Sequence, residues 1–430
     1  MFCKSLANRS PDKSVHKPTR GRGAPAEKPH PGTARRHETT RDDHRPDPHG
    51  FEQGLALTQR RRVAEALVVV AAFYALFVWL RIDQHNVKWF VHLGRRFETA
   101  AHTSSKIGPQ LGAQSKIGYD GQYYFAIAVD PEHARDYLGF RAGYVYGRPV
   151  LPLLAGGLGG GSVRVVPYTL LVIDLVAVLV ATLAVGLWLR ARGISPWWSA
   201  VFGLYPGLAS TVFRDLTEPL AFAFVAAAML AWEHRRTWLS ASLFALALLT
   251  RETTFPFALA GVALVALEAR AWRRPLAYFA VAFGPFVAWK EIVAIWIGRQ
   301  TQQGITLVPF GGILHYRPLD ATHRLIVAVV LVPALLAAVG ALVVARRAPV
   351  EAALVVVTTL LYVVFLRKND YVDWGAAGRD ATPVVLATVY CLGVRLRRMP
   401  FVVALGAWSL PTYLLVAHLF GLNGLMLVTQ

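Results

Sequence analysis

The sequence predicts an all-α polytopic membrane protein, and three observations lead to that class. The 430 residues are 55% hydrophobic and only 17% charged, whereas soluble domains average about 45–50% apolar and about 25% charged residues. Apolar runs close to bilayer-spanning length recur along most of the chain. Short basic clusters separate these runs, which is typical of a protein whose cytoplasmic loops fix its orientation.

The N-terminal segment differs in composition from the rest. Residues 1–62 are rich in Arg, Lys, His, Pro and Asp, so we expect a disordered basic cytoplasmic tail. Residues 63–430 are expected to form the transmembrane domain. The formal net charge of +19 lies largely in the tail and in the short clusters between apolar runs. Because no single basic face is indicated, we expect no nucleic-acid binding.

The spanning segments follow from length, since about 20 apolar residues cross a bilayer. We expect about eleven spans, the first of them followed by a long extracytoplasmic loop at 81–166. With a cytoplasmic N-terminus, every basic cluster then falls on the cytoplasmic side of the cell membrane. The spans are 63–80, 167–189, 197–213, 219–232, 238–249, 253–267, 276–297, 325–345, 352–366, 382–394 and 401–420. The basic clusters are 60–62, 190–192, 234–236, 270–274, 346–347 and 395–398.

The first extracytoplasmic loop is expected to carry short interfacial helices. Its most informative stretch is the Tyr-Asp-Gly tripeptide at 119–121, which begins an aromatic-rich apolar run at 121–129. We expect this run to form a short helix with an aromatic face along the membrane. The helix should end near Asp130 and Pro131, because the residue before a proline is disfavoured in a helix.

Two later hairpins, 197–232 and 238–267, hold apolar runs that are short for a bilayer. A helix of about 14 residues is only about 21 Å long, against roughly 30 Å of hydrocarbon. The charged turns should therefore lie below the outer surface, in a water-filled hollow or buried in protein. Ion pairs that only stabilise the packing are the alternative interpretation. The turns carry Arg214, Asp215, Glu218, Arg251 and Glu252.

Asp120 is the candidate catalytic base. A carboxylate among aromatic rings at a membrane surface is costly to desolvate, so it calls for a reason. Its neighbours supply a flexible backbone position, rings and polar groups that suit a sugar. The alternative is that Asp120 caps the short helix that follows, since Asp is a favoured N-cap residue. The expected substrate-binding neighbours are Tyr119, Gly121, Gln122, Tyr123 and Tyr124.

An outer-facing sugar transferase would take its sugar from a polyprenyl phosphate, because nucleotide sugars are not expected on that side of the membrane. The phosphate leaving group needs positive charge, which Arg supplies best. The carboxylates near the site would also suit Mg²⁺ or Mn²⁺, although the spacing assigns no metal ligand. The candidate phosphate ligands are Arg251, Arg379 and Arg214. Further candidates for substrate binding are Arg148, Asp215, Glu218 and Glu252.

These residues resemble the polytopic GT-C glycosyltransferases, which carry an acidic residue in their first outer loop. One branch contains the second mannosyltransferase of GPI-anchor synthesis and its bacterial relatives. Its Trp-Asp-Gly/Ala-aromatic stretch, which ends in Ile-Ala, is similar to 119–128 here, with Tyr in place of Trp. Its Pro-x-x-Pro element matches 149–152, and its Tyr-Pro and Thr-Glu-Ser-Leu segments match 205–206 and 217–220, with Pro219 in place of Ser.

The resemblance implies a GT-C-like fold and an inverting hexosyl transfer, with mannose favoured, from a polyprenyl phosphate-linked donor to a lipid or glycan acceptor. Asp120 occupies the base position. A transporter or flippase for a lipid-linked saccharide is the alternative function, although such proteins usually show two related halves and no internal repeat is evident here. A membrane assembly scaffold is the third interpretation, and it gains nothing from polar side chains sunk in short hairpins.

Overall fold

The computed structural model describes residues 48–84, 86–101, 107, 115–269, 271–298, 306–393 and 399–409. Contacts divide the chain into Met1–Leu57 and Thr58–Gln430, and all helices after the first one described belong to the second unit. The expected tail at 1–47 and the end of the last expected span lie outside the described residues. The first helix, α2 (Pro48–Gln84), begins fourteen residues before Arg62. The segment 48–62, expected to be disordered, is therefore helical, because its Glu, Gln, Leu, Ala and Arg residues readily continue a helix.

The described residues form an all-helical fold. They contain no strand, and a lone bridge joins Gly94 and Ser115. Four segments are long and apolar enough to cross a membrane, which agrees with the predicted class of protein. The first of these lies in α2, and the last combines α17 (Ala321–Ile326), the π-helical turn Val327–Leu331 and α18 (Val332–Val344). The segments are Leu57–Ile82, Val166–Ala191, Arg273–Ile297 and Ala321–Val344.

The other expected spans form shorter helices, so a total of eleven crossings stays a prediction. Proline stands at the first or second position of several of them, where its fixed φ suits a helix and its missing N–H is not needed. Two long helices belong to the same part of the chain, α9 (Val166–Ala191) and α15 (Arg273–Ile297). The shorter ones are α10 (Trp198–Gly203), α11 (Pro206–Val212), α12 (Glu218–Glu233), α13 (Thr237–Thr250), α14 (Phe255–Glu268), α19 (Pro349–Thr359), α21 (Thr382–Cys391) and α22 (Met399–Ala407).

The expected span at 197–213 is not one continuous helix. Tyr205 precedes Pro206 and has an extended ψ of 123°, because the residue before a proline avoids the helical region. A second break separates α20 (Trp374–Asp380) from α21. The first break contacts α20, since the Tyr205 hydroxyl donates to the Gly378 carbonyl at 2.9 Å. A Cβ on Gly207 would lie 2.2 Å from the same carbonyl oxygen, so glycine is required there.

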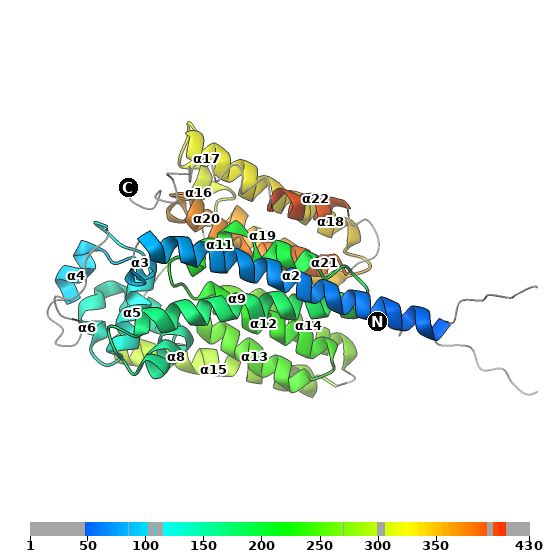
Figure 1. Ribbon diagram of the computed structural model, residues 1–430, viewed down its shortest axis with the longest axis horizontal. Helices are drawn as coiled ribbons and strands as arrows, with labels where there is room; N and C mark the ends of the chain where they lie inside the picture. The colour runs from blue at the N-terminus through cyan, green and yellow to red at the C-terminus, as the bar shows by residue number, and fades with distance from the viewer. Residues whose placement is uncertain are drawn as a thin grey trace, which may run out of the picture. The chain divides into compact units, whose positions relative to one another are not determined.

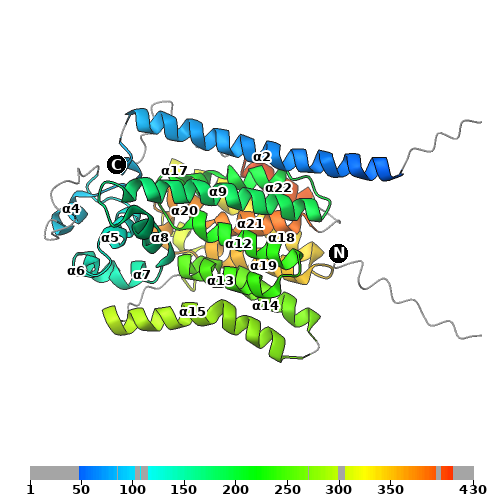
Figure 2. The same ribbon diagram turned by 60° about the horizontal axis from the view of Figure 1, so that its bottom comes forward.

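The helices run side by side in a bundle, with α12 packed between α9 and α13 and α15 along one edge (Figures 1 and 2). At one end, two predicted basic loops meet acidic helix termini. Arg192 after α9 pairs with Glu233 at 2.9 Å and with Glu351 at 3.6 Å. Arg235 after α12 pairs with Glu268 at 2.8 Å. These clusters therefore share one end of the bundle, called the basic end below.

The predicted first loop forms short helices at the opposite end (Figure 1). The expected helix at 121–129 is confirmed as α5 and ends before Asp130. Its aromatic face does not lie along a membrane surface, because all nine residues are buried and a Cβ on Gly156 of α8 would touch the Ala128 carbonyl at 2.4 Å. The loop helices are α3 (Lys88–Val91), α4 (Arg95–Ala101), α5 (Gly121–Val129), α6 (Ala134–Leu138), α7 (Ala142–Tyr146) and α8 (Val150–Gly159).

Candidate functional site

Asp120 lies directly before α5 but does not cap it. Its backbone is already helical (φ −63°, ψ −25°) and its side chain makes no capping hydrogen bond. The carboxylate instead faces two guanidinium groups, with Arg379 Nη1 at 3.5 Å from Oδ2 and Arg141 Nη1 at 3.9 Å from Oδ1. Both distances are long for ion pairs. The capping interpretation thus gains no support, and Asp120 keeps hydrogen-bonding capacity for another partner.

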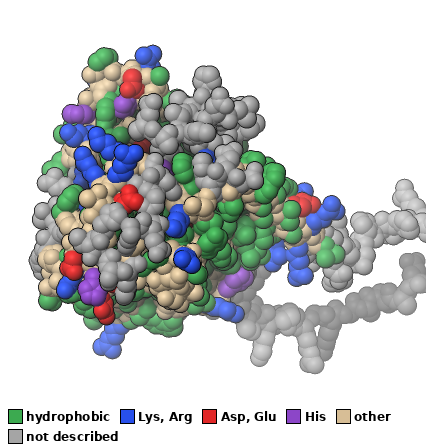
Figure 3. Space-filling model, turned by 60° about the vertical axis from the view of Figure 1, so that its left-hand side comes forward, with side chains coloured by type: hydrophobic (Ala, Val, Ile, Leu, Met, Phe, Trp, Pro, Cys, Tyr) green, Lys and Arg blue, Asp and Glu red, His purple; other side chains and the backbone are tan. Residues whose placement is uncertain are grey.

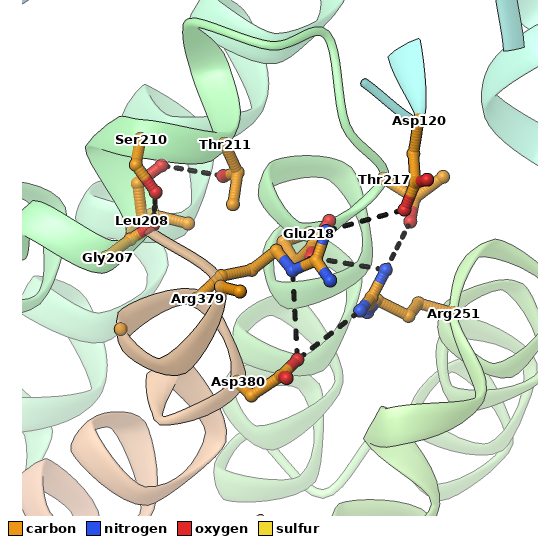
Figure 4. A network of polar contacts seen from close by, with 12 residues as sticks. Asp120, Gly207, Leu208, Ser210, Thr211, Thr217, Glu218, Arg251, Arg379 and Asp380 are labelled. Atoms are coloured by element: carbon orange, nitrogen blue, oxygen red, sulfur yellow. Dashed lines mark hydrogen bonds and ion pairs between the residues drawn. The ribbon is translucent and has the colours of Figure 1, made fainter. Parts of the chain in front are cut away.

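Arg379 connects Asp120 to a buried network that also contains Glu218, Arg251 and Asp380 (Figure 4). Arg379 Nε lies 3.2 Å from Glu218 Oε1 and 3.7 Å from Asp380 Oδ1. Arg251 binds the same two carboxylates, with Nη1 at 3.1 Å from Glu218 and Nη2 at 3.7 Å from Asp380. These five residues are called the Arg379 network. It brings together Asp120, Glu218, Arg251 and Arg379, all of which the sequence had singled out.

Short helices place these charges. Glu218 begins α12, which has 16 residues, and Arg251 follows α13, which has 14 residues. At about 1.5 Å per residue these helices are roughly 24 and 21 Å long, shorter than the roughly 30 Å of bilayer hydrocarbon. Arg379 lies on α20, whose N-cap Asp373 accepts from the Ala376 N–H at 2.8 Å. Within the hairpin turns Asp215, Glu218 and Arg251 are buried, as expected, whereas Arg214 and Glu252 are only partly buried.

Burial differs sharply within the Arg379 network. The side chains of Glu218 and Arg251 are 1% and 4% exposed, whereas that of Asp120 is 25% exposed. Burial raises the pKa of Asp380 to about 6, although Arg379 beside it lowers that pKa. Glu218 and Asp380 are thus balanced by Arg251 and Arg379 inside the protein, as the packing interpretation expected. Asp120 is the carboxylate of this network that solvent and a ligand reach best.

Tyr119 lies between two cations. The Arg214 guanidinium stands 4.1 Å from the ring centroid, and that of Arg379 stands 5.6 Å away. Arg214 forms no ion pair with any described residue, and its buried Nη1 has no hydrogen-bond partner. Among the three expected phosphate ligands, Arg214 therefore has unused donors. Arg251 and Arg379 already bind carboxylates.

Other residues of the predicted motif hold the loop in place. The Gly94 N–H donates to Gln122 Oε1 at 3.0 Å, and Gln122 Nε2 donates to the Ile117 carbonyl at 3.2 Å. This gives Gln122 a structural role. A Cβ on Gly121 would lie 2.1 Å from the Arg214 carbonyl oxygen. The close backbone approach expected of Gly121 is therefore present, and it joins α5 to the turn before α12.

Tyr123 contributes through its hydroxyl. Arg141 Nη1 donates to this hydroxyl at 2.6 Å, and the guanidinium also lies 5.0 Å from the ring centroid. Because Arg141 also faces Asp120, Tyr123 helps to place a cation beside the candidate base. In the sequence, Arg141 is a charge of the first loop that could line the acceptor side, although the favoured interpretation was a solvated loop charge.

A second polar cluster surrounds Arg148 and is called the Arg148 cluster. Arg148 donates Nε to Glu252 Oε2 at 2.9 Å and Nη2 to the other oxygen of the same carboxylate. Its Nη1 donates to the Tyr124 hydroxyl at 2.9 Å, and its guanidinium stacks 3.9 Å from the Tyr144 ring. Tyr144 interacts electrostatically with both Asp120 and Arg251. The Arg148 cluster thus adjoins the Arg379 network through Tyr144.

Asp215 does not join either cluster. It is fully buried, its φ is +49°, and both carboxylate oxygens lack a hydrogen-bond partner in the described part of the chain. It interacts electrostatically with Asp174 inside α9. The suggested role of Asp215 as a ligand for substrate or for Mg²⁺ or Mn²⁺ has no geometric support. The described residues also contain no group of three His, Cys, Asp or Glu side chains placed to hold a metal ion.

Several contributors escaped sequence reasoning. Asp380 was known only as the neighbour of Arg379, and Thr217, whose hydroxyl lies 3.4 Å from Arg251 Nη1, was not considered. Lys290 stands inside an apolar span, a position where an ionisable residue is a functional candidate by default. That signal was available in the sequence.

The surface at this end is rich in charge. Figure 3 turns this end toward the viewer and shows blue basic side chains gathered on it, with red and purple side chains among them.

Comparison of the chain with protein-family models, with curated proteins and with solved structures finds no match.

Proposed function

We propose that this chain is a membrane glycosyltransferase of the GT-C type. It would move a sugar, with mannose as the first candidate, from a polyprenyl phosphate-linked donor to a lipid or glycan acceptor. The proposal places about eleven spans in the cell membrane, with the N-terminus cytoplasmic and the site extracytoplasmic. The observation that carries it is Asp120, a partly exposed carboxylate that caps no helix and borders a buried network of arginines.

Asp120 suits the role of general base. A base must accept a proton from the acceptor hydroxyl, so it needs an accessible oxygen and no tight donor. Its side chain is 25% exposed, and its nearest cation, Arg379, is 3.5 Å away. Glu218 and Asp380 are held by two arginines each and lie deeper. Those two carboxylates therefore hold Arg251 and Arg379 in place, and Asp120 remains available to accept a proton.

The cations suit a departing phosphate. Arg214 has unused donors and stacks on Tyr119, the residue before Asp120. Arg379 lies 5.6 Å from the centroid of the same ring and 3.5 Å from Asp120. Charge-assisted hydrogen bonds from guanidinium groups are among the strongest that a phosphate receives. We assign Arg214 and Arg379 to the phosphate, and Arg251 to the support of Arg379 through Glu218 and Asp380.

The proposed reaction is a single displacement. The acceptor hydroxyl gives its proton to Asp120 while its oxygen bonds to the anomeric carbon of the donor. The bond between that carbon and the phosphate oxygen breaks, and polyprenyl phosphate leaves with the electron pair. Attack and departure on opposite faces invert the anomeric centre. The proton then passes from Asp120 to solvent.

The test replaces Asp120 with its uncharged amide. Asp120→Asn should lower sugar transfer from a radiolabelled polyprenyl phosphate mannose in proteoliposomes by about 10²–10⁴-fold, the usual contribution of a general base. Asp136→Asn is the matched control, since Asp136 is a 65% exposed loop residue. Full activity of Asp120→Asn would remove Asp120 from the mechanism. Movement of the lipid-linked sugar across the bilayer without bond cleavage would favour the transporter alternative.

A further inference from the structure

Lys290 is an unusual residue for its position. It lies on α15, a helix of 25 residues along the edge of the bundle (Figure 2). Only 11% of the apolar, membrane-spanning part of this helix is buried inside the protein. Exposed side chains on both sides of Lys290, among them Val287 and Ile292, give this helix a lipid-facing surface. Lys290 precedes the helix end at Ile297 by seven residues, or about 10 Å along the axis. An ammonium group there is costly unless an anion accompanies it.

The protein does not supply Lys290 with a full partner. No described residue forms an ion pair or hydrogen bond with its ammonium group. The nearest carboxylate in electrostatic range is Glu252, and both oxygens of Glu252 already accept from Arg148. Two cations thus share one carboxylate. The Arg148 cluster together with Lys290 carries one positive charge in excess.

A series of contacts leads from Lys290 toward the candidate base. A Cβ on Gly147 would lie 2.3 Å from Lys290 Nζ, so the ammonium group touches the backbone next to Arg148. Arg148 stacks on Tyr144 at 3.9 Å, and Tyr144 is within electrostatic range of Asp120. Arg148 and Tyr144 therefore link the Lys290 ammonium group to the surroundings of Asp120.

The outer part of α15 is anchored, which keeps Lys290 in place. Trp289 donates its indole N–H to the Tyr146 carbonyl at 2.8 Å. Trp296 stands 5.1 Å from the Tyr146 ring and 5.2 Å from the Arg135 guanidinium. These contacts join α15 to α7 on either side of Lys290. The packing of α15 against α7 therefore holds Lys290 near the Arg148 cluster, in addition to the contacts of its own side chain.

We propose that Lys290 binds the phosphate group of a polyprenyl lipid that enters from the bilayer beside α15. The phosphate neutralises the excess charge, and the polyprenyl chain stays in lipid along the exposed face of α15. Arg148 acts as a positioning residue, because it occupies Glu252 and so leaves the Lys290 ammonium available. This inference rests on the proposed function for the identity of the lipid. It adds a binding residue and a direction of entry that the proposed function does not contain.

The experiment measures binding of radiolabelled polyprenyl phosphate, without a sugar, to the full chain in nanodiscs. Lys290→Gln should weaken binding about tenfold, which corresponds to about 1.4 kcal/mol, and Lys290→Arg should keep binding within about threefold. Removal of a charge from a lipid-facing helix favours membrane insertion, so Lys290→Gln should still fold. Arg274→Gln is the matched control, because Arg274 lies at the other end of α15. Polyprenol, which lacks the phosphate, should bind weakly to wild type.

Two results would overturn the inference. One is equal affinity of wild type and Lys290→Gln for polyprenyl phosphate. The other is full displacement of the lipid by millimolar inorganic phosphate, which would indicate a site for free phosphate. Failure of the proposed function would appear in a different experiment, the transfer assay. There, either wild type would transfer no sugar or Asp120→Asn would transfer it at the wild-type rate. Binding of polyprenyl phosphate in the absence of a sugar does not require transfer. With an active enzyme, Lys290→Gln should raise KM for the donor and leave kcat nearly unchanged.

Discussion

Two ion pairs of the same kind, one at each end of the bundle, stand in opposite settings. At the basic end, Arg235 and Glu268 pair through side chains that are 65% and 24% exposed, and exposed pairs contribute about 0–1 kcal/mol to stability. At the site end, Arg251 and Glu218 are 4% and 1% exposed. Removal of one member of such a buried pair costs about 3–5 kcal/mol. The depth of a pair, and not its residue types, decides whether it shapes the fold.

The sharpest way to test this contrast is Glu218→Gln. The substitution keeps the size of the side chain but leaves Arg251 and Arg379 with one carboxylate fewer, inside the protein. We expect a loss of about 3–5 kcal/mol in the free energy of unfolding. Thermal unfolding of the purified protein in detergent would reveal it as a large fall in melting temperature.

The matched substitution at the basic end is Glu268→Gln, which removes the partner of Arg235. Its expected cost is below about 1 kcal/mol, because water replaces the lost carboxylate. Equal melting temperatures for the two variants would contradict the contrast between the ends.

A smaller effect is expected from Gly121→Ala. The new methyl group would meet the Arg214 carbonyl oxygen at 2.1 Å, so the start of α5 must move away from the turn before α12. Such overpacking costs about 1–3 kcal/mol, and the same shift would displace Asp120 from Arg379. Gly157→Ala in α8 is the control, since a Cβ there meets nothing within 4 Å. If both variants unfold at the wild-type temperature, the close approach at Gly121 does not hold the site together.

A further, modest effect concerns pH. Burial raises the pKa of Asp380 to about 6 in the folded protein, against about 3.9 in an unfolded chain. The folded state then binds this proton more tightly, so the contribution of Asp380 to stability grows as pH falls from about 6 toward 4. Relative to pH 7, the gain at pH 5 is on the order of 1 kcal/mol.

The melting temperature of wild type minus that of Asp380→Asn measures this contribution, because other titrating groups cancel in the difference. The difference should shift in favour of wild type between pH 7 and pH 5. A difference that stays constant over that range would mean that Asp380 keeps its charge in the folded protein.

The sequence predicted the charged core of the site well. Asp120, Glu218, Arg251 and Arg379 each stood out because a charge in or beside an apolar segment needs a reason, and the structure brings these four together. The bounds of α5 were also predictable, since Pro131 limits how far its helix runs. Pattern and breaker residues carry this kind of information locally.

The sequence did not predict which partners each charge would select. Asp215 stands three residues before Glu218, yet its φ is +49° and both of its buried carboxylate oxygens lack a hydrogen-bond partner in the described part of the chain. Gln122 belongs to the aromatic motif, yet it binds the backbone of Gly94 and Ile117. These outcomes depend on backbone turns and on contacts between distant segments. Local composition does not encode either of them.

The contact between the first helix break and α20 has a consequence for Arg379. Tyr205 and Gly207 both close on the carbonyl of Gly378, which is the residue before Arg379. The peptide that carries this guanidinium is thus immobilised during folding, before any ligand arrives. A dipole or cation that is fixed in advance requires no reorganisation when an anion forms nearby. The kinked helices therefore give the molecule a preorganised electrostatic environment. The backbone that carries Arg379 loses its conformational entropy during folding and not when an anion binds.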